Sequence, residues 1–155
     1  MVIRPAQPSE FAAIGDLCVA AYASFVHGDK GYVNELRDVA KRAVAAEVLV
    51  TDDLSGTVTF VPAGGPLAEI STPEESEFRM LAVDPAARGR GVGSELMRHI
   101  LEASKDAGKA GIVCSSLAQM TTAHRIYERL GFTRAPERDW SPTAGVDLLA
   151  FELRF

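Results

Sequence analysis

The 155-residue sequence is poor in cysteine and contains only Cys18 and Cys114, each within a short apolar run. Two isolated cysteines support neither a disulfide framework nor a cysteine-based zinc site, and we expect buried free thiols in a reducing compartment. The sequence also has no run of lysine and arginine, and its net charge is −5. Because nucleic-acid-binding proteins usually carry a basic face, we expect no nucleic-acid partner.

Long apolar runs are missing as well. We find no apolar stretch of membrane-spanning length and no signal-peptide pattern, so we expect a cytoplasmic protein without a membrane partner. Apolar residues make up 47% of the chain and charged residues 24%, as in ordinary globular proteins. This length suits one hydrophobic core, and we expect a single domain over residues 1–155.

Hydrophobic periodicity predicts a mixed α/β sheet. We expect strands over 2–4, 47–51, 57–61, 78–83, 112–115 and 146–155, and helices over 9–26, 32–46, 91–107 and 122–130. The second helix has a narrow apolar stripe formed by Val33, Leu36, Ala40 and Val44. Residues 62–75 form a loop longer than is usual in compact domains, and such loops are often functional.

The clearest local pattern follows the strand that ends at Val83. It reads Arg88-Gly89-Arg90-Gly91-Val92-Gly93 and runs directly into a helix. Alternating glycines let the backbone approach a ligand closely. The first helical turn offers N–H groups without intrahelical partners and the positive end of the helix dipole, and the two arginines add charge. The pattern therefore predicts a phosphate-binding site.

Two better-known phosphate loops do not fit this sequence. The Walker pattern of glycine, four residues and Gly-Lys-Ser/Thr does not occur. The dinucleotide fingerprint, read from Gly89, has Ser94 in place of its third glycine. The next strand ends at Ser115-Ser116 and offers no acidic residue to hold a ribose. A different phosphate-bearing ligand is therefore expected.

Two motifs together resemble the GNAT family of N-acetyltransferases. Arg88, Gly91 and Gly93 match its Arg/Gln-x-x-Gly-x-Gly/Ala signature. Residues 124–132, which read His-Arg-Ile-Tyr-Glu-Arg-Leu-Gly-Phe, resemble its second motif, a tyrosine-bearing helix that ends in Leu-Gly-Phe. The layout of the whole chain also resembles the family. The resemblance implies a central, mostly antiparallel sheet with a splayed parallel strand pair, flanked by about four helices.

The resemblance implies an acyl-CoA-dependent N-acyltransferase that moves acetyl from acetyl-CoA, as cosubstrate, to an amine by direct attack, without a metal. Seven residues before the motif tyrosine, where many members have asparagine, this chain has Met120. The alternative is a non-catalytic acyl-CoA-binding regulatory domain. The positions implied to bind the pantetheine arm are Leu81, Ala82 and Val83, and those for the diphosphate are Arg88, Gly89, Arg90, Gly91, Val92, Gly93 and Ser94.

Acyl transfer needs an acid for the departing thiolate and a base for the attacking amine. Tyr127 resembles the family's general acid, and an unperturbed phenol has a pKa of about 10; a packing role on its helix face remains open. Glu77 resembles a catalytic glutamate of some members and would act through water. It precedes the central strand beside Glu74 and Glu75, however, and such acids are usually just a solvated loop, so this alternative remains open. His124 lies one turn before Tyr127 and is expected to be a surface histidine.

No motif identifies the acceptor. The family's default is an amine, so we expect a small-molecule or peptide amine. In the resembling fold the first two helices and the loop between them wall the acceptor side, and the long loop and Trp140 are further candidates. Dimers are common among proteins that resemble this one, and a homodimer is compatible with the sequence. The candidate acceptor contacts are Tyr22, Phe25, His27, Tyr32 and Ser115. Aromatic residues near helix ends are mostly core residues, and Ser115 could simply end its strand, so these alternatives remain open.

Overall fold

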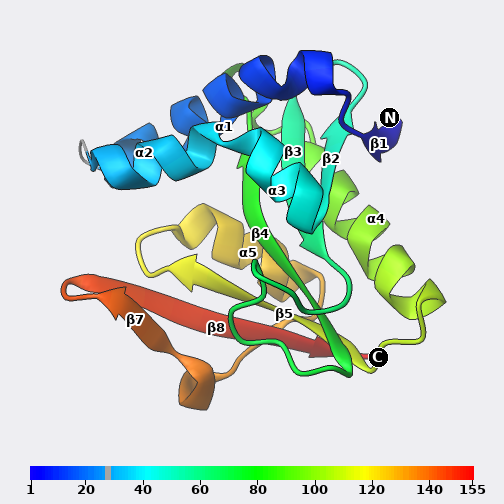
Figure 1. The fold of residues 1–155 in the computed structure, drawn as a ribbon. Coiled ribbons are helices and arrows are strands. Elements are labelled where there is room, and N and C mark those ends of the chain that lie inside the picture. The colour runs from blue at the N-terminus through cyan, green and yellow to red at the C-terminus, as the bar shows by residue number, and fades with distance from the viewer. Residues whose placement is uncertain (27–28) are drawn as a thin grey trace.

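The computed structural model describes residues 1–26 and 29–155, which form one eight-stranded mixed sheet with helices on both faces (Figure 1). The strand order is β1-β2-β3-β4-β5-β8-β6, and β7 pairs with β8. The strands are β1 (Ile3–Pro5), β2 (Glu47–Thr51), β3 (Gly56–Val61), β4 (Glu75–Val83), β5 (Gly111–Leu117), β6 (Thr133–Arg134), β7 (Trp140–Thr143) and β8 (Val146–Arg154). The α-helices are α1 (Phe11–Val26), α2 (Lys30–Arg37), α3 (Val39–Ala45), α4 (Val92–Asp106) and α5 (Thr121–Arg129).

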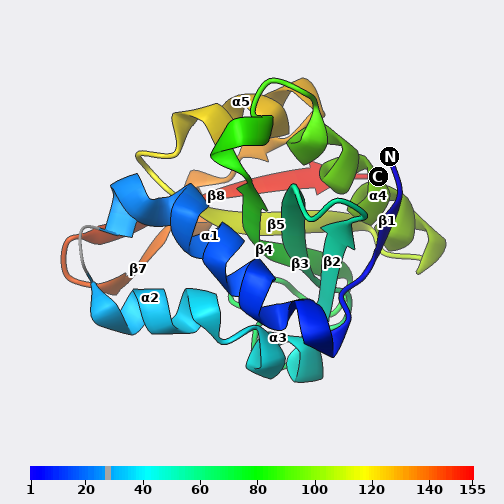
Figure 2. The same cartoon turned by 90° about the horizontal axis from the view of Figure 1, so that it is seen from above.

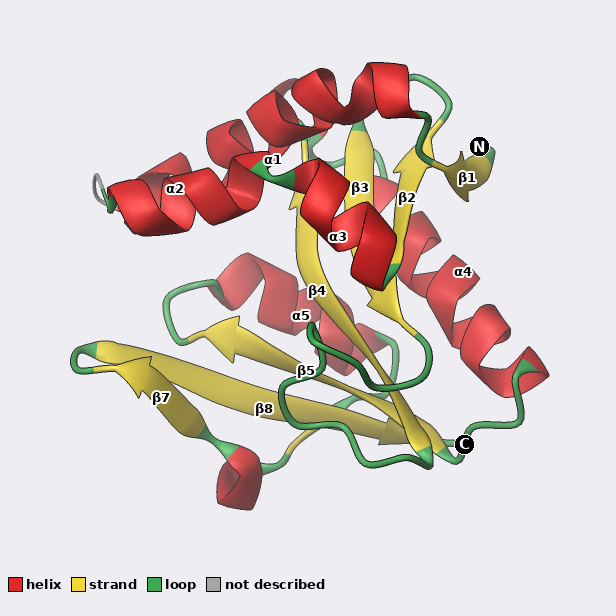
Figure 3. Cartoon of the chain, in the orientation of Figure 1, coloured by secondary structure: helices red, strands yellow, loops and turns green. Residues whose placement is uncertain are grey.

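The sheet separates two hydrophobic cores, because successive strand residues point to opposite faces. Seen from above, α1, α2 and α3 lie on one side of the sheet, and α4 and α5 lie on the other (Figure 2). Ala82 of β4 packs toward α1 in one cluster, whereas its neighbour Leu81 packs with α4 and Tyr127 in the other. The predicted mixed α/β architecture is confirmed (Figure 3).

The strands β4 and β5 are the parallel pair, and they separate along their length (Figure 1). Their pairing covers only three positions, from Glu75 opposite Gly111 to Glu77 opposite Val113. On its other edge β4 continues to pair with β3, through a register shift beside Met80, whose φ of 53° is unusual for a non-glycine residue. The expected splayed pair is therefore present, and β4 is bent where the two strands separate.

Residues 8–26, which include α1, are long and apolar enough to cross a membrane by length and composition. This finding corrects the expectation that the sequence contains no such stretch. In the structure, Ile14, Cys18 and Tyr22 are buried and pack with Val48 and Val50 of β2. Burial against the sheet accounts for the apolar face of α1, because core helices need such a face.

The helix predicted over 32–46 is wrong as one element, because it breaks at Asp38. The carboxylate of Asp38 accepts a hydrogen bond from the backbone N–H of Lys41 and caps α3. The guanidinium of Arg42 then donates to the carbonyl of Leu36, near the end of α2. A side chain of α3 thus supplies a hydrogen-bond donor to a carbonyl near the C-terminal end of α2.

The break also changes which residues of this segment are buried. Val39 and Arg42 of α3 are buried, whereas Val44 is 92% exposed. Of the predicted apolar stripe, Leu36 is therefore buried as expected, whereas Val44 is exposed. The cause is geometric: after the change of direction at Asp38, a different face of the chain points toward the sheet.

Two further boundaries differ from the sequence prediction. The strand β4 begins at Glu75 rather than Phe78, so the preceding loop is shorter and Glu77 lies within the strand. Residues 140–143, expected to be a loop, form β7 against β8. The side chain of Trp140 donates from Nε1 to Ser115 Oγ at 3.0 Å, which ties this added strand to β5.

Candidate active site

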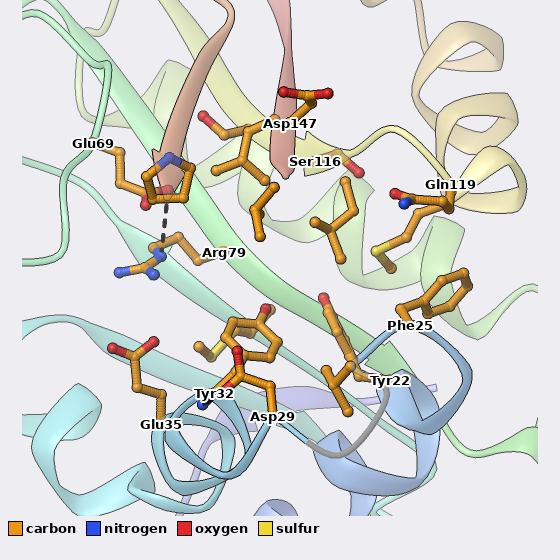
Figure 4. Close-up of a pocket in the computed structure, with 18 of the residues that line it drawn as sticks. Tyr22, Phe25, Asp29, Tyr32, Glu35, Glu69, Arg79, Ser116, Gln119 and Asp147 are labelled. Atoms are coloured by element: carbon orange, nitrogen blue, oxygen red, sulfur yellow. Dashed lines mark hydrogen bonds and ion pairs between the residues drawn. The ribbon is translucent and has the colours of Figure 1, made fainter. Parts of the chain in front are cut away.

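A cavity of about 700 Å³ opens where β4 and β5 separate (Figure 4). Its wall combines α1 and α2, both parallel strands, Tyr127 of α5 with the segment before that helix, and the β7–β8 hairpin. The described residues that line it include Tyr22, Phe25, Asp29, Tyr32, Glu35, Glu69, Phe78, Arg79, Met80, Leu81, Ser115, Ser116, Leu117, Gln119, Met120, Tyr127 and Asp147. A concave site with few polar groups among apolar walls is the usual form of a small-molecule site.

Several residues singled out in the sequence meet in this cavity. Those in its wall are Tyr22, Phe25, Tyr32, Leu81, Ser115, Met120 and Tyr127. The hydroxyl of Tyr22 donates to the carbonyl of Leu81 at 3.1 Å, which links α1 to the bent part of β4. His27 lies outside the described residues. Neither Glu77 nor the glycine-rich segment is among the lining residues described.

Tyr127 reaches the cavity from α5 and is 4% exposed. Its ring lies in an aromatic cluster with Phe78, Phe132 and Phe151, at centroid distances of 5.4 to 5.8 Å. Burial raises the pKa of Tyr127 well above its ordinary value, Cys114 raises it further, and Ser116 acts in the opposite direction. The phenol therefore holds its proton at neutral pH, as a proton donor must.

His124 is buried, so the expectation of a surface histidine is wrong. The side chain is 9% exposed, and its ring lies 4.8 Å from that of Phe151 on β8. Its Nε2 lies 3.1 Å from Ser116 Oγ on β5. His124 lies on the same face of α5 as Tyr127, and this face packs toward β5 and β8.

Glu77 lies within β4 and is fully buried, not in the loop where the sequence placed it. Its carboxylate accepts hydrogen bonds from the backbone N–H groups of Glu69, Ile70 and Ser71 at 3.0 to 3.2 Å. A carboxylate with several backbone donors is well suited to fixing a loop. Through these contacts Glu77 anchors the loop of residues 69–71 to β4. A direct role of Glu77 as base stays a prediction.

The loop anchored by Glu77 carries Glu69, a residue that the sequence reasoning did not single out. Its carboxylate lies in the cavity wall and forms an ion pair with Arg79 Nε at 3.6 Å (Figure 4). Burial raises the pKa of Glu69, Arg79 opposes this, and the carboxylates of Glu77 and Glu35 raise it again. A carboxylate with a raised pKa is a better proton acceptor at neutral pH.

Replacing Glu77 with glutamine tests the anchoring role. We expect Glu77→Gln to lower the free energy of unfolding by about 1 to 3 kcal/mol, since an amide cannot accept from all of the donors. The KM for the acceptor should rise, while coenzyme A affinity should stay unchanged. Chemical denaturation and calorimetry measure these quantities, with the exposed Glu74→Gln as control. Equal stability of the two variants would contradict the anchor.

The glycine-rich segment forms the start of α4. Gly91 is the N-cap with φ of 78° and no side-chain cap, and Gly89 has φ of 81°. A Cβ built at either glycine meets no atom of the described residues within 4 Å, so neither is packed against this part of the chain. Gly93 packs instead against Ile126, the neighbour of Tyr127 on α5. The start of α4 therefore has backbone N–H groups without a side-chain cap, as at the helix starts that commonly bind phosphate groups. A diphosphate site at residues 88–94 stays a prediction.

A glycine-rich helix start and a cavity between splayed parallel strands are the two features that the resemblance to the acetyltransferases implied. Residues 39–134, more than half of the chain, match the family described as "Acetyltransferase (GNAT) domain". The chain therefore belongs to the GNAT acetyltransferase family.

Curated relatives match parts of the chain. The N-acetylaspartate synthetase of Danio rerio is 30% identical over 84 residues, which is 51% of this chain and 30% of that protein. The mycothiol acetyltransferase of Rhodococcus erythropolis is 37% identical over 62 residues, which is 40% of this chain and 21% of that protein. The chain thus spans less than a third of the length of these relatives.

Solved structures match nearly the whole chain. The yncA protein of Salmonella typhimurium, solved with its cofactor acetyl-CoA, has a TM-score of 0.69 at 22% identity and covers 99% of this chain and 92% of that one. The PaiA N-acetyltransferase of Thermoplasma acidophilum, solved with coenzyme A, has a TM-score of 0.74 at 15% identity, with 99% and 98% coverage. At these identities the likeness establishes the shared fold.

Proposed function

We propose that this chain transfers the acetyl group of acetyl-CoA to an amine acceptor by direct attack. Acetyl-CoA supplies the acetyl group as a thioester. The observation that carries the proposal is the cavity between β4 and β5, because its wall brings Tyr127 together with the acidic residues of the acceptor side. Family membership supports the same activity.

The chain offers two elements for the donor. Beyond Glu77, β4 is paired with β3 on one edge, and its pairing with β5 has ended on the other. An extended pantetheine arm can add to this second edge as a strand does, along Leu81, Ala82 and Val83. The carbonyl of Leu81 already accepts from Tyr22 and keeps a second lone pair. The start of α4 binds the diphosphate through backbone N–H groups.

Two side chains of the cavity can serve as the general acid and the general base. Tyr127, which holds its proton at neutral pH, donates it to the departing sulfur. Glu69, whose pKa is raised by burial, accepts the proton of the acceptor's ammonium group. Glu77 supports this reaction indirectly, since it holds the backbone of Glu69 in place. General acid–base catalysis of this kind contributes a factor of about 10² to 10⁴ to a rate.

The charges of the cavity favour a cationic acceptor. Its described lining includes the carboxylates Asp29, Glu35, Glu69 and Asp147, against one guanidinium, that of Arg79. Aromatic side chains at Tyr22, Phe25 and Tyr32 add apolar surface beside them. We therefore propose that the acceptor is a small-molecule or peptide amine that carries a second positive charge. Complementary charge raises both the rate of association and the specificity for such an acceptor.

Release of free thiol from acetyl-CoA tests this function across a panel of amines. The panel compares linear diamines, monoamines of equal length and amino acids with a free carboxylate. We expect diamines to have the highest kcat/KM, because their second cation meets the acidic wall. A preference for the carboxylate-bearing amines would contradict the proposed acceptor class.

Met120 favours one second candidate, a non-catalytic acyl-CoA-binding domain. This residue replaces the asparagine of many family members and lies in the cavity wall. The same thiol assay, combined with calorimetry, separates the two functions. Coenzyme A binding without turnover on any amine would support the second candidate, and absence of coenzyme A binding would exclude both.

A further inference from the structure

The hairpin of β7 and β8 forms one wall of the cavity, and the chain is held firmly just before this wall begins. The guanidinium of Arg138 donates to the buried carboxylate of Glu75 at 2.7 and 3.0 Å and to the carbonyl of Ile70 at 2.6 Å. The hairpin then starts at Trp140. Its residues in the cavity wall are Pro142, Thr143, Gly145, Val146, Asp147 and Leu148.

Trp140 links β7 to β5 across the strand that lies between them. The strand β8 pairs with β5 along one edge and with β7 along the other (Figure 1). Neighbouring strands lie about 4.8 Å apart, so a long side chain is needed to span from β7 to β5. The indole Nε1 of Trp140 lies 3.0 Å from Ser115 Oγ. Because an indole N–H can only donate, Ser115 accepts this hydrogen bond.

The strand registers place this bond on the face of the sheet that carries the cavity. Leu148 of β8 lies opposite Leu117 of β5 on one edge and opposite Trp140 on the other. Directly opposite side chains share a face, and so do side chains two residues apart in a strand. Ser115, Leu117 and Leu148 line the cavity, whereas Trp140 is not among the lining residues described. The indole therefore supports the wall from beside it.

We propose that Trp140 is a positioning residue that holds the β7–β8 hairpin against β5 and thereby sets the width of the acceptor side of the cavity. The inference rests on the proposed function, in which the amine acceptor occupies this cavity. Beyond Trp140 the register shifts, and the next pair is Thr143 opposite Val146. Two strands alone are marginally stable. The bond to Ser115 therefore fixes a wall that lies across the cavity from Tyr22 and Tyr32 (Figure 4).

A double-mutant cycle on this hydrogen bond tests the proposal by kinetics. The variants are Trp140→Phe, which keeps an aromatic ring, Ser115→Ala, and the two together. We expect each single variant to raise the KM of a linear diamine about three- to tenfold, as for one lost hydrogen bond, with kcat and coenzyme A affinity within about twofold. The double variant should have the KM of the single variants, because both changes remove the same bond. Effects on KM that multiply in the double variant would overturn the proposal.

Ser115→Thr is the conservative variant, because its hydroxyl can still accept from Trp140 and threonine is well suited to a strand. We expect it to keep the parent KM. If Trp140→Phe does not fold, the comparison of Ser115→Ala with Ser115→Thr replaces the cycle, since neither change alters the indole. An equal KM in these two variants would show that the hydroxyl does not matter and would overturn the proposal.

A second measurement follows the indole itself and does not depend on turnover. Trp140 is the one tryptophan of the sequence, so tryptophan fluorescence reports on it alone. We expect Ser115→Ala to increase the quenching of this fluorescence by acrylamide, because the indole loses its partner, and Ser115→Thr to leave the quenching unchanged.

The two measurements together separate the possible failures. Unchanged quenching in Ser115→Ala would overturn the hold on the hairpin. Increased quenching with an unchanged KM in an active chain would overturn its effect on the acceptor. Increased quenching in a chain that acetylates no amine would uphold the contact between Trp140 and Ser115 and refute the proposed function instead.

Discussion

Replacing Tyr127 with phenylalanine is expected to lower kcat by a factor of about 10² to 10⁴, the usual contribution of a general acid. The change removes one hydroxyl and keeps the ring, whose contacts with Phe78, Phe132 and Phe151 remain. Coenzyme A affinity should therefore stay within about twofold, since no proposed cofactor contact is lost. Steady-state kinetics and calorimetry on the same preparation measure both quantities.

Tyr127→Leu is the matched variant that separates the acid from the packing role. It removes the hydroxyl and the aromatic ring together, so the free energy of unfolding should fall by about 2 to 5 kcal/mol. Tyr127→Phe should retain most of the parent stability. If Tyr127→Phe kept the parent kcat while Tyr127→Leu lost stability, Tyr127 would be a packing residue, and the acid would have to be sought elsewhere in the cavity.

The parts of the fold that sequence could predict are those set by local pattern. The glycine-rich segment and the helix that follows it are contiguous in the sequence, so both can be predicted without knowing what packs against them. The break at Asp38 could not be read in this way. Both halves of the segment have helical periodicity, and the interruption is stabilised when Arg42 reaches back to the carbonyl of Leu36. The contact between Arg42 and Leu36 forms only when the chain already turns at Asp38, so it is not visible in a local pattern.

In the site, too, local patterns could be predicted from the sequence and distant contacts could not. A motif located Tyr127, and helical spacing placed His124 on the same side, yet the burial of His124 comes from Phe151 of β8. Glu69 depends on still more distant contacts, since its place in the cavity requires Glu77 and Arg79 from β4. Acidic residues are common in surface loops, so composition alone could not separate Glu69 from its neighbours.

The other large effect is expected at the start of α4. Replacing Gly91 with valine should weaken coenzyme A binding at least about tenfold while the chain remains folded, because the added side chain enters the space before the first-turn N–H groups. Within residues 1–26 and 29–155, a Cβ at this position meets no atom within 4 Å, so it does not disturb their packing. The φ of 78° adds a backbone cost of about 1 to 2 kcal/mol for a non-glycine residue.

Gly108, just beyond the other end of α4, supplies a closely matched control. Its φ is 74°, and a Cβ there also meets no atom within 4 Å among the residues that the structure describes. Gly108→Val should therefore have a similar backbone cost, measured by denaturation, and leave coenzyme A affinity unchanged in calorimetry. Because the two variants share the strain and differ in their position on the helix, a loss of affinity confined to Gly91→Val would assign the effect to the diphosphate cradle. Equal affinities in two folded variants would refute the cradle.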